Sequence, residues 1–270
     1  MSSDFFPSLE GKAWAQTRTA LHDYARVLGA YRKTLSPRRK HWWHISLRPT
    51  LTGLNTGPLW SDGEWFSLEL DLRRPGVIMR NGEGERQRVN IRGESGLDLQ
   101  MAIDERLLEW GLEITLEDDS IGDAPHQVDA DQSSQLHVSL LSFSGCLDRF
   151  RSTLSQETSP IQVWPHHFDL AMLVLTGGTV EGADPEDETR YDEQLNFGFS
   201  PGDEHIAQPY VYVTRYPEPE RLAQAQMLDG AAWHDGGWQG IAVPWMVLTE
   251  TDHPMDWLVE QFRQAIEAGL

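Results

Sequence analysis

The chain has 270 residues, 39% of them hydrophobic, and a formal net charge of -20 from 42 acidic and 22 basic residues. That length and apolar content are enough for a sizeable core, in one large domain or in two packed halves. Because the negative field repels nucleic-acid backbones and anionic membranes, we expect neither as a partner. Such acidity also favours solubility without implying any partner.

Cys146 is the only cysteine, so no intrachain disulfide is possible and nothing points to an oxidising compartment. It falls in a predicted helix without a basic cluster, which favours a buried structural thiol over a nucleophile. The N-terminus has no basic segment followed by an apolar core, and no run of about 18 apolar residues occurs. We therefore expect a cytoplasmic protein.

The first half begins with a predicted helix over residues 12–35. Its apolar positions alternate in steps of three and four, which places them on one stripe. The helix ends at Ser36, because a residue before proline is pushed out of the helical region. Two strands are then expected, over residues 43–47 and 65–72, where apolar and polar residues alternate.

A hairpin and a second helix complete this half. Residues 77–79 and 88–91 flank the pair Asn81-Gly82, a strong signal for a tight turn. Ser95, with an aspartate three residues later, predicts a capping box that starts a helix running to about residue 110. A further strand is expected over residues 112–116. The acidic segment 117–131, poor in large apolar residues, predicts the boundary between halves.

The second half repeats this order. A helix is predicted over residues 133–154, and five of the six positions in its apolar stripe correspond to apolar positions in the stripe of the first helix. Strands follow, and a last helix is expected over residues 255–268. An internal duplication is one explanation, and chance similarity between two amphipathic helices is the other. We predict an α+β fold with two similar halves, residues 1–120 and 121–270, each a long amphipathic helix with antiparallel strands and a second helix.

Two of the expected strands in the second half carry polar and aromatic side chains. Residues 168–175 form one, followed by an exposed excursion over residues 176–193. Residues 208–214 form another, with Tyr210, Tyr212 and Thr214 on one face.

Several short motifs occur in a fixed order along the chain. They are His-Trp-Trp-His from His41, Trp-Pro-His-His-Phe-Asp-Leu-Ala from Trp164, Gly-Phe-Ser-Pro-Gly-Asp from Gly198, Pro-Tyr-Val-Tyr-Val from Pro209 and Tyr-Pro-Glu-Pro from Tyr216. Over nearly the whole chain this set resembles the domain of unknown function 5996 family. The resemblance implies no activity, because that family has no established function.

The chemistry must therefore come from the residues. The stretch 164–170 has a fainter echo at residues 41–47. In an extended segment His166 and His167 point to opposite faces, whereas His167 and Asp169 share one. Imidazole and carboxylate together suit zinc, iron or manganese. The candidate metal ligands are His44, His167, Asp169, Asp203, Glu204 and His205. No compact metal motif is present, and histidines hydrogen-bonded for structure explain the pattern equally.

The aromatic residues near these stretches suggest a different site. Tryptophan and tyrosine join an apolar face to a polar tip, which suits a pocket for a small organic ligand, although they also suit a core. Our leading hypothesis is a small-ligand pocket where the halves meet. Its predicted lining is His44, Ser46, His167, Asp169, Trp43, Trp164, Tyr210 and Tyr212. The alternatives are a metal-dependent hydrolase, with no catalytic residues assigned, and a structural or interaction protein.

Overall fold

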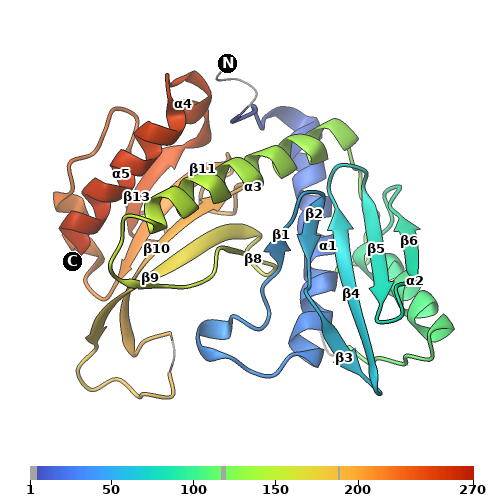
Figure 1. The fold of residues 1–270 in the computed structure, drawn as a ribbon. Coiled ribbons are helices and arrows are strands. Elements are labelled where there is room, and N and C mark those ends of the chain that lie inside the picture. The colour runs from blue at the N-terminus through green and yellow to red at the C-terminus, as the bar shows by residue number, and fades with distance from the viewer. Residues whose placement is uncertain (1–4, 117–119, 188) are drawn as a thin grey trace. The chain divides into compact units, whose positions relative to one another are not determined.

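The computed structural model describes residues 5–116, 120–187 and 189–270 (Figure 1). The chain forms two compact units, and each unit is made of stretches that are not continuous in the sequence. The N-terminal unit contains residues 9–137 and 163–168, and the C-terminal unit contains residues 5–8, 138–162 and the described residues from 169 onward. Each unit has its own antiparallel sheet and its own helices, which confirms the α+β class. The internal duplication stays a prediction.

The N-terminal unit is built on a six-stranded sheet in the order β1-β2-β4-β5-β6, with β3 beside β4. Its strands are β1 (Arg48–Pro49), β2 (Gly53–Asn55), β3 (Leu59–Ser61), β4 (Glu64–Asp71), β5 (Gly76–Asn81) and β6 (Arg86–Asn90). Its helices are α1 (Gly11–Leu35), the short 3-10 helix η1 (Lys40–Trp42) and α2 (Gly96–Glu109).

The predicted stripe of α1 is the face that this helix buries. Trp14, Leu21 and Leu28 are among its core side chains. The Tyr24 hydroxyl donates to the backbone carbonyl of Glu94 at 2.7 Å. Because a buried hydroxyl needs a partner, this bond allows a tyrosine where an aliphatic residue would otherwise stand.

Asp23 joins α1 to the segments that follow the sheet. Its carboxylate is 5% exposed and accepts hydrogen bonds from the backbone N–H of Gly96 at 3.0 Å and of Gly122 at 2.9 Å. The Nε2 atom of His126 lies 2.9 Å from the same carboxylate. A Cβ on Gly96 would lie 2.4 Å from the Asp23 carboxylate, so a glycine is needed there. One buried side chain thus fixes the start of α2 and the chain beyond it.

Replacing Asp23 with alanine should destabilise the protein strongly. The substitution leaves two buried N–H groups and an imidazole without their acceptor, and such losses typically cost about 3–5 kcal/mol. Urea denaturation gives the free energy of unfolding, and amide exchange at Gly96 and Gly122 reports the local loss. Glu105→Ala, an exposed change on α2, is the control and should stay within about 0.5 kcal/mol. A loss below about 1 kcal/mol for Asp23→Ala would contradict this role.

The C-terminal unit contains a seven-stranded sheet in the order β12-β13-β11-β10-β9-β7, with β8 off this path beside β9. Its strands are β7 (Glu157–Thr158), β8 (Gln162–Trp164), β9 (Asp169–Thr179), β10 (Asp192–Ser200), β11 (Tyr210–Tyr216), β12 (Ala232–His234) and β13 (Gly240–Pro244). The helices are α3 (Ala130–Arg151), which begins in the N-terminal unit, the 3-10 helix η2 (Pro219–Gln224), α4 (Trp245–Glu250) and α5 (Pro254–Gly269).

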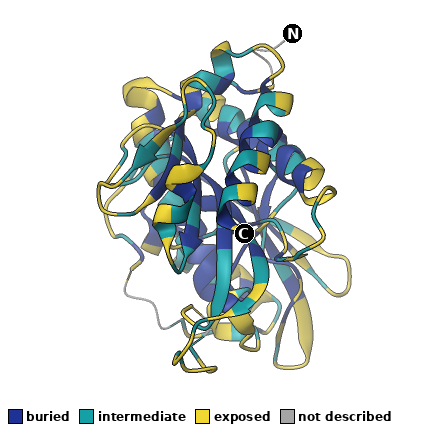
Figure 2. Cartoon of the chain, turned by 90° about the vertical axis from the view of Figure 1, so that its left-hand side faces the viewer, coloured by how far each residue is buried: buried dark blue, intermediate teal, exposed yellow. Residues whose placement is uncertain are grey.

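One face of this second sheet is covered by helices. Phe197 of β10 lies 4.8 Å from Phe150 of α3 and 5.1 Å from Phe262 of α5, measured between ring centroids. Figure 2 shows buried residues along the strands and the inner helix faces, with loops exposed. Because side chains alternate along a strand, the neighbours of Phe197 must point to the opposite face.

Three local predictions need correction. Residues 43–46 form a turn and irregular backbone instead of a strand, following a left-handed residue at His41 with a φ of 53°, and only Leu47 makes a β-bridge. No strand forms over 112–116. The predicted hairpin is confirmed, but four residues, 82–85, connect β5 and β6 instead of a two-residue turn. No helix in the described part of the chain is long and apolar enough to cross a membrane.

Candidate functional site

Within the double-histidine stretch 164–170, residues 165–168 form a turn between β8 and β9, so His166 and His167 are not in an extended segment, while the strand expected over 168–175 forms as β9. Trp164 ends β8 and Asp169 begins β9, and the Trp164 carbonyl accepts the backbone N–H of Phe168 at 2.6 Å. The His166 and His167 rings are exposed, with centroids 4.3 Å apart. Strand alternation therefore does not set the directions of His166 and His167, and it does not place His167 on the same face as Asp169.

This turn lies against α1. A Cβ on Gly29 would lie 2.6 Å from the Pro165 side chain, so glycine makes room for the turn. The His22 ring stacks on Phe168 at 5.3 Å, and its Nε2 atom lies 3.1 Å from the His166 carbonyl oxygen. Burial lowers the pKa of His22 to about 4, and the positive charge of Arg26 acts in the same direction. His22 is therefore neutral at pH 7.

The echo stretch lies beside the double-histidine stretch. Leu47 and Val163 exchange two backbone hydrogen bonds, of 2.9 and 2.8 Å, in an antiparallel bridge. The bridge therefore holds the end of residues 41–47 next to the beginning of residues 164–170.

The predicted site residues of the echo make local contacts. His44 is buried, and its Nδ1 atom accepts the backbone N–H of Arg39 at 3.3 Å. Ser46 is also buried and donates to the Trp43 carbonyl at 3.0 Å. Both bonds join residues close in sequence and stabilise a turn. For His44 this is a structural role, which is the alternative to a metal site.

The titration of His22 should make stability depend on pH. Its pKa is about 4 in the folded protein and 6.5 in an ordinary setting, so the unfolded chain binds more protons between these values. Stability is therefore highest above about pH 6.5 and falls as pH drops toward about 4, by up to about 3 kcal/mol from this group. His22→Phe keeps a ring against Phe168 and removes the titration. Urea titrations at pH 7 and 4.5 should show a smaller loss for the variant; equal losses would contradict the assignment.

In the C-terminal unit, the face of the sheet away from the phenylalanines carries polar and aromatic residues. Tyr212 pairs with Gly198, and Tyr210 pairs with Ser200, so both tyrosines lie on this face, as predicted. A Cβ on Gly198 would lie 2.2 Å from the Tyr212 ring, which shows that the ring lies directly over the glycine. Asp169, at the start of β9, completes this surface.

Hydrogen bonds tie each tyrosine to a carboxylate. The Tyr212 hydroxyl donates to Asp169 and accepts from the Asn196 amide nitrogen at 3.3 Å. The Tyr210 hydroxyl donates to Asp203 at 2.5 Å. Burial and the neighbouring carboxylates raise the pKa of both tyrosines. For Asp203, burial opposes ionisation, but bonds from Tyr210 and two backbone N–H groups outweigh it and lower the pKa.

Trp238 adds a third aromatic ring. It stacks on Tyr210 at 5.8 Å with an interplanar angle of 15°, and its centroid lies 6.1 Å from that of Tyr212. Within the described ranges, the inaccessible Trp238 Nε1 and Asn196 Oδ1 atoms have no hydrogen-bond partner. We call this set the tyrosine–aspartate cluster; it consists of Asp169, Asn196, Asp203, Tyr210, Tyr212 and Trp238.

The predicted metal ligands do not gather in one described group. Among residues 5–116, 120–187 and 189–270, no set of three or more histidine, cysteine or acidic side chains is placed to hold an ion. His44 and His167 belong to the N-terminal unit, and the other four belong to the C-terminal unit. Asp203 is engaged by Tyr210 and by backbone N–H groups, and the Glu204 side chain is 86% exposed. A metal stays a prediction.

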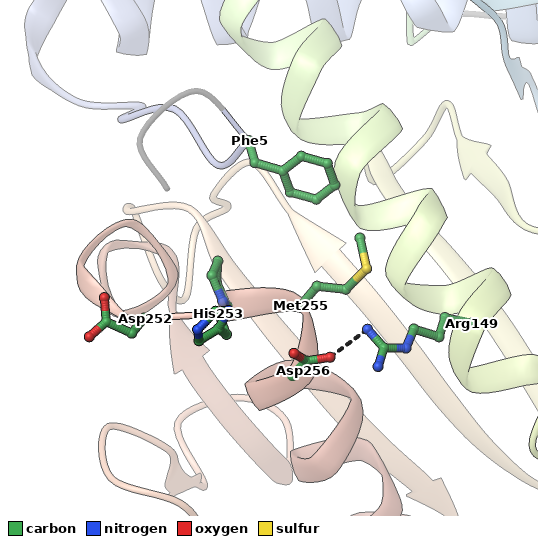
Figure 3. Close-up of a pocket in the computed structure, with 7 residues that line it drawn as sticks. Phe5, Arg149, Asp252, His253, Met255 and Asp256 are labelled. Atoms are coloured by element: carbon green, nitrogen blue, oxygen red, sulfur yellow. Dashed lines mark ion pairs between the residues drawn. The ribbon is translucent and has the colours of Figure 1, made fainter. Parts of the chain in front are cut away.

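A separate pocket of about 430 Å³ lies on the helix side of this unit (Figure 3). Phe5, Pro254 and Met255 provide apolar lining, while Arg149 and Asp256 form an ion pair at 2.5 Å. Both charged side chains are more than half exposed. Because these charges already satisfy each other at the surface, the pocket offers a ligand less than the cluster does.

Removing the Tyr212 hydroxyl should destabilise the C-terminal unit. Tyr212→Phe keeps the ring over Gly198 but takes a donor from the buried Asp169 carboxylate, and a hydrogen bond to a charged group contributes about 1.5–3 kcal/mol. We expect the free energy of unfolding in urea to fall by about 2 kcal/mol. Tyr216→Phe, at the end of the same strand, is the matched control and should change it little. Equal effects of the two substitutions would count against the Tyr212–Asp169 bond.

The chain is thus an α+β protein with two antiparallel sheets and a tyrosine–aspartate cluster whose members Asp169, Tyr210 and Tyr212 are buried. It belongs to DUF5996, a family of unknown function, whose model matches residues 6–270. The resemblance seen in the ordered motifs is thereby confirmed. No curated protein and no solved structure matches the chain.

Sequence reasoning missed two members of the cluster. The alternation Asn196-Phe197-Gly198-Phe199 is the pattern of a strand with one apolar face, and it would have placed Asn196 beside the tyrosines. Trp238 lies in a glycine-rich connection before β13, where no periodic signal exists. Only the folded chain brings that ring to Tyr210.

Proposed function

We propose that the protein binds a small organic amine at the tyrosine–aspartate cluster. The observation that carries this proposal is the pair of unsatisfied buried atoms beside Tyr212, the amide oxygen of Asn196 and the indole N–H of Trp238. Other inaccessible atoms of the described residues, such as Trp14 Nε1 and Trp110 Nε1, also lack partners, but Asn196 and Trp238 belong to one cluster, which supports a bound molecule or a buried water there. The ligand must supply a donor for Asn196 and an acceptor for Trp238.

The charge of the cluster supports a cationic ligand over an anionic one. The lowered pKa of Asp203 keeps this carboxylate ionised at neutral pH. Three aromatic rings lie within about 6 Å of one another, and an ammonium group is attracted to such faces. An amine that also carries a hydroxyl or carbonyl group would meet every requirement, so we infer an amino alcohol or an amino amide.

Binding should be detectable with amino alcohols and amino amides. In thermal shift and NMR titrations at pH 7, we expect members of this panel to bind, while hydroxy acids of matched size do not. Trp238→Phe keeps the ring but removes its N–H donor, and should weaken binding at least about tenfold, the value of one lost bond to a buried partner. Mass spectrometry of ligands released from freshly purified protein provides an independent readout.

Trp233→Phe is the matched control, because Trp233 pairs with Ile241 on the other face of the same sheet. This variant should bind as the natural protein does. If no amine binds, or if hydroxy acids bind equally well, the proposal is wrong. If Trp238→Phe and Trp233→Phe bind equally, a ligand exists but does not occupy the cluster.

A further inference from the structure

A second, independent site lies at the edge of the N-terminal sheet. A pocket of about 540 Å³ opens beside β6, which is the last strand in the sheet order. Its lining contains four arginines and no acidic side chain; the residues are Arg74, Pro75, Arg86, Arg88, Asn90, Ile91 and Arg92. In a chain with a net charge of -20, this is a local reversal of sign. A concentration of positive charge in a concave surface favours anions.

Arg88 is held in place by the protein itself. Its Nη1 atom lies 2.9 Å from the buried Asp71 carboxylate, its Nε donates to Asn90 at 3.0 Å, and its Nη2 donates to the Arg74 carbonyl. Gly76 on β5 leaves room for this guanidinium, since a Cβ there would lie 2.8 Å from Nη2. A side chain ordered before binding loses little freedom when a ligand arrives.

The other three arginines are available to a ligand. Arg74, Arg86 and Arg92 are exposed, and their guanidinium groups form no ion pair or hydrogen bond with any residue that the structure describes. Arg86 is two residues from Arg88 on one strand, so both point to the same face. The nearby Glu94 side chain is outside the lining and accepts the backbone N–H of Arg92. The lining itself therefore has a net positive charge.

We propose that this arginine pocket binds a small anion that carries two or more negative charges on phosphate or carboxylate groups. Guanidinium groups recognise both kinds of group through paired N–H bonds. The ligand is compact, because the negative field of the whole chain repels long polyanions such as nucleic acids.

Edge protection is the competing explanation for these arginines. Charged side chains on an edge strand discourage pairing with another sheet. That role requires charge alone, and lysine would serve it as well as arginine. It does not require a fixed guanidinium, a glycine beneath it or a pocket. Replacement by lysine therefore separates the two explanations.

The experiment is calorimetric titration of the full chain with inorganic phosphate, pyrophosphate and citrate at constant ionic strength. We expect at least one of these ions to bind with a Kd below about 1 mM. The double variant Arg86→Gln, Arg92→Gln should weaken it at least about tenfold, and Arg86→Lys should weaken it detectably although the charge is kept. Arg88 is left intact, because its loss would strand the buried Asp71. Arg263→Gln, at an exposed arginine of the C-terminal unit, is the control for the loss of a positive charge away from the pocket and should bind normally.

The three ions distinguish the source of the anionic group. Pyrophosphate or phosphate binding without citrate binding assigns a phosphoryl ligand, and the reverse assigns a carboxylate; either supports the site. If all three ions fail to bind, or if Arg263→Gln weakens binding as much as the pocket variants, the proposal is overturned. Absence of binding by all three ions, together with aggregation of the double variant, would leave edge protection as the explanation.

Discussion

The N-terminal unit depends on one buried carboxylate. Asp23 stands on the inner face of α1 and accepts from Gly96, Gly122 and the His126 ring, which belong to segments far along the chain. A buried charge is costly unless hydrogen bonds compensate it, so the surrounding backbone must take one arrangement. The hydrophobic stripe of α1 brings this helix to the core. Asp23 then determines which backbone segments meet it there.

The C-terminal unit uses the two faces of one sheet for different purposes. Phe197 packs against Phe150 of α3 and Phe262 of α5, and Phe199 packs against Phe143 of α3. Gly198, which lies between them on β10, faces the other side of the sheet with Tyr210 and Tyr212. The first face supplies stability through burial of aromatic area. The second retains hydrogen-bonding groups in a setting of reduced solvent access, where electrostatic interactions are stronger than in water. Strand alternation therefore places apolar core side chains on one face of the sheet and hydrogen-bonding side chains on the other.

The sequence predicted regular elements well where a period extended over many residues. The three-four rhythm of α1 and α3 and the capping box of α2 identified those helices closely. It failed where single backbone conformations decide: His41 has a positive φ just before the expected strand 43–47, and Phe168 has a positive φ in the turn that precedes β9. Of the predicted ligand residues, Asp169, Tyr210 and Tyr212 do come together. Asn196 joins them through the alternation of β10, which the sequence displays, whereas Trp238 joins them through loop closure, which no local pattern encodes.

The contact between Gly198 and Tyr212 restricts how this chain can change during evolution. Any side chain at position 198 would collide with the ring over it, so the glycine can vary only after the tyrosine shrinks or moves. Loss of the tyrosine in turn removes a donor from Asp169. Changes at these three positions must therefore occur together or in a set order. Family members should then differ there as a group, and such linked variation would separate branches that retain this surface from branches that have remodelled it.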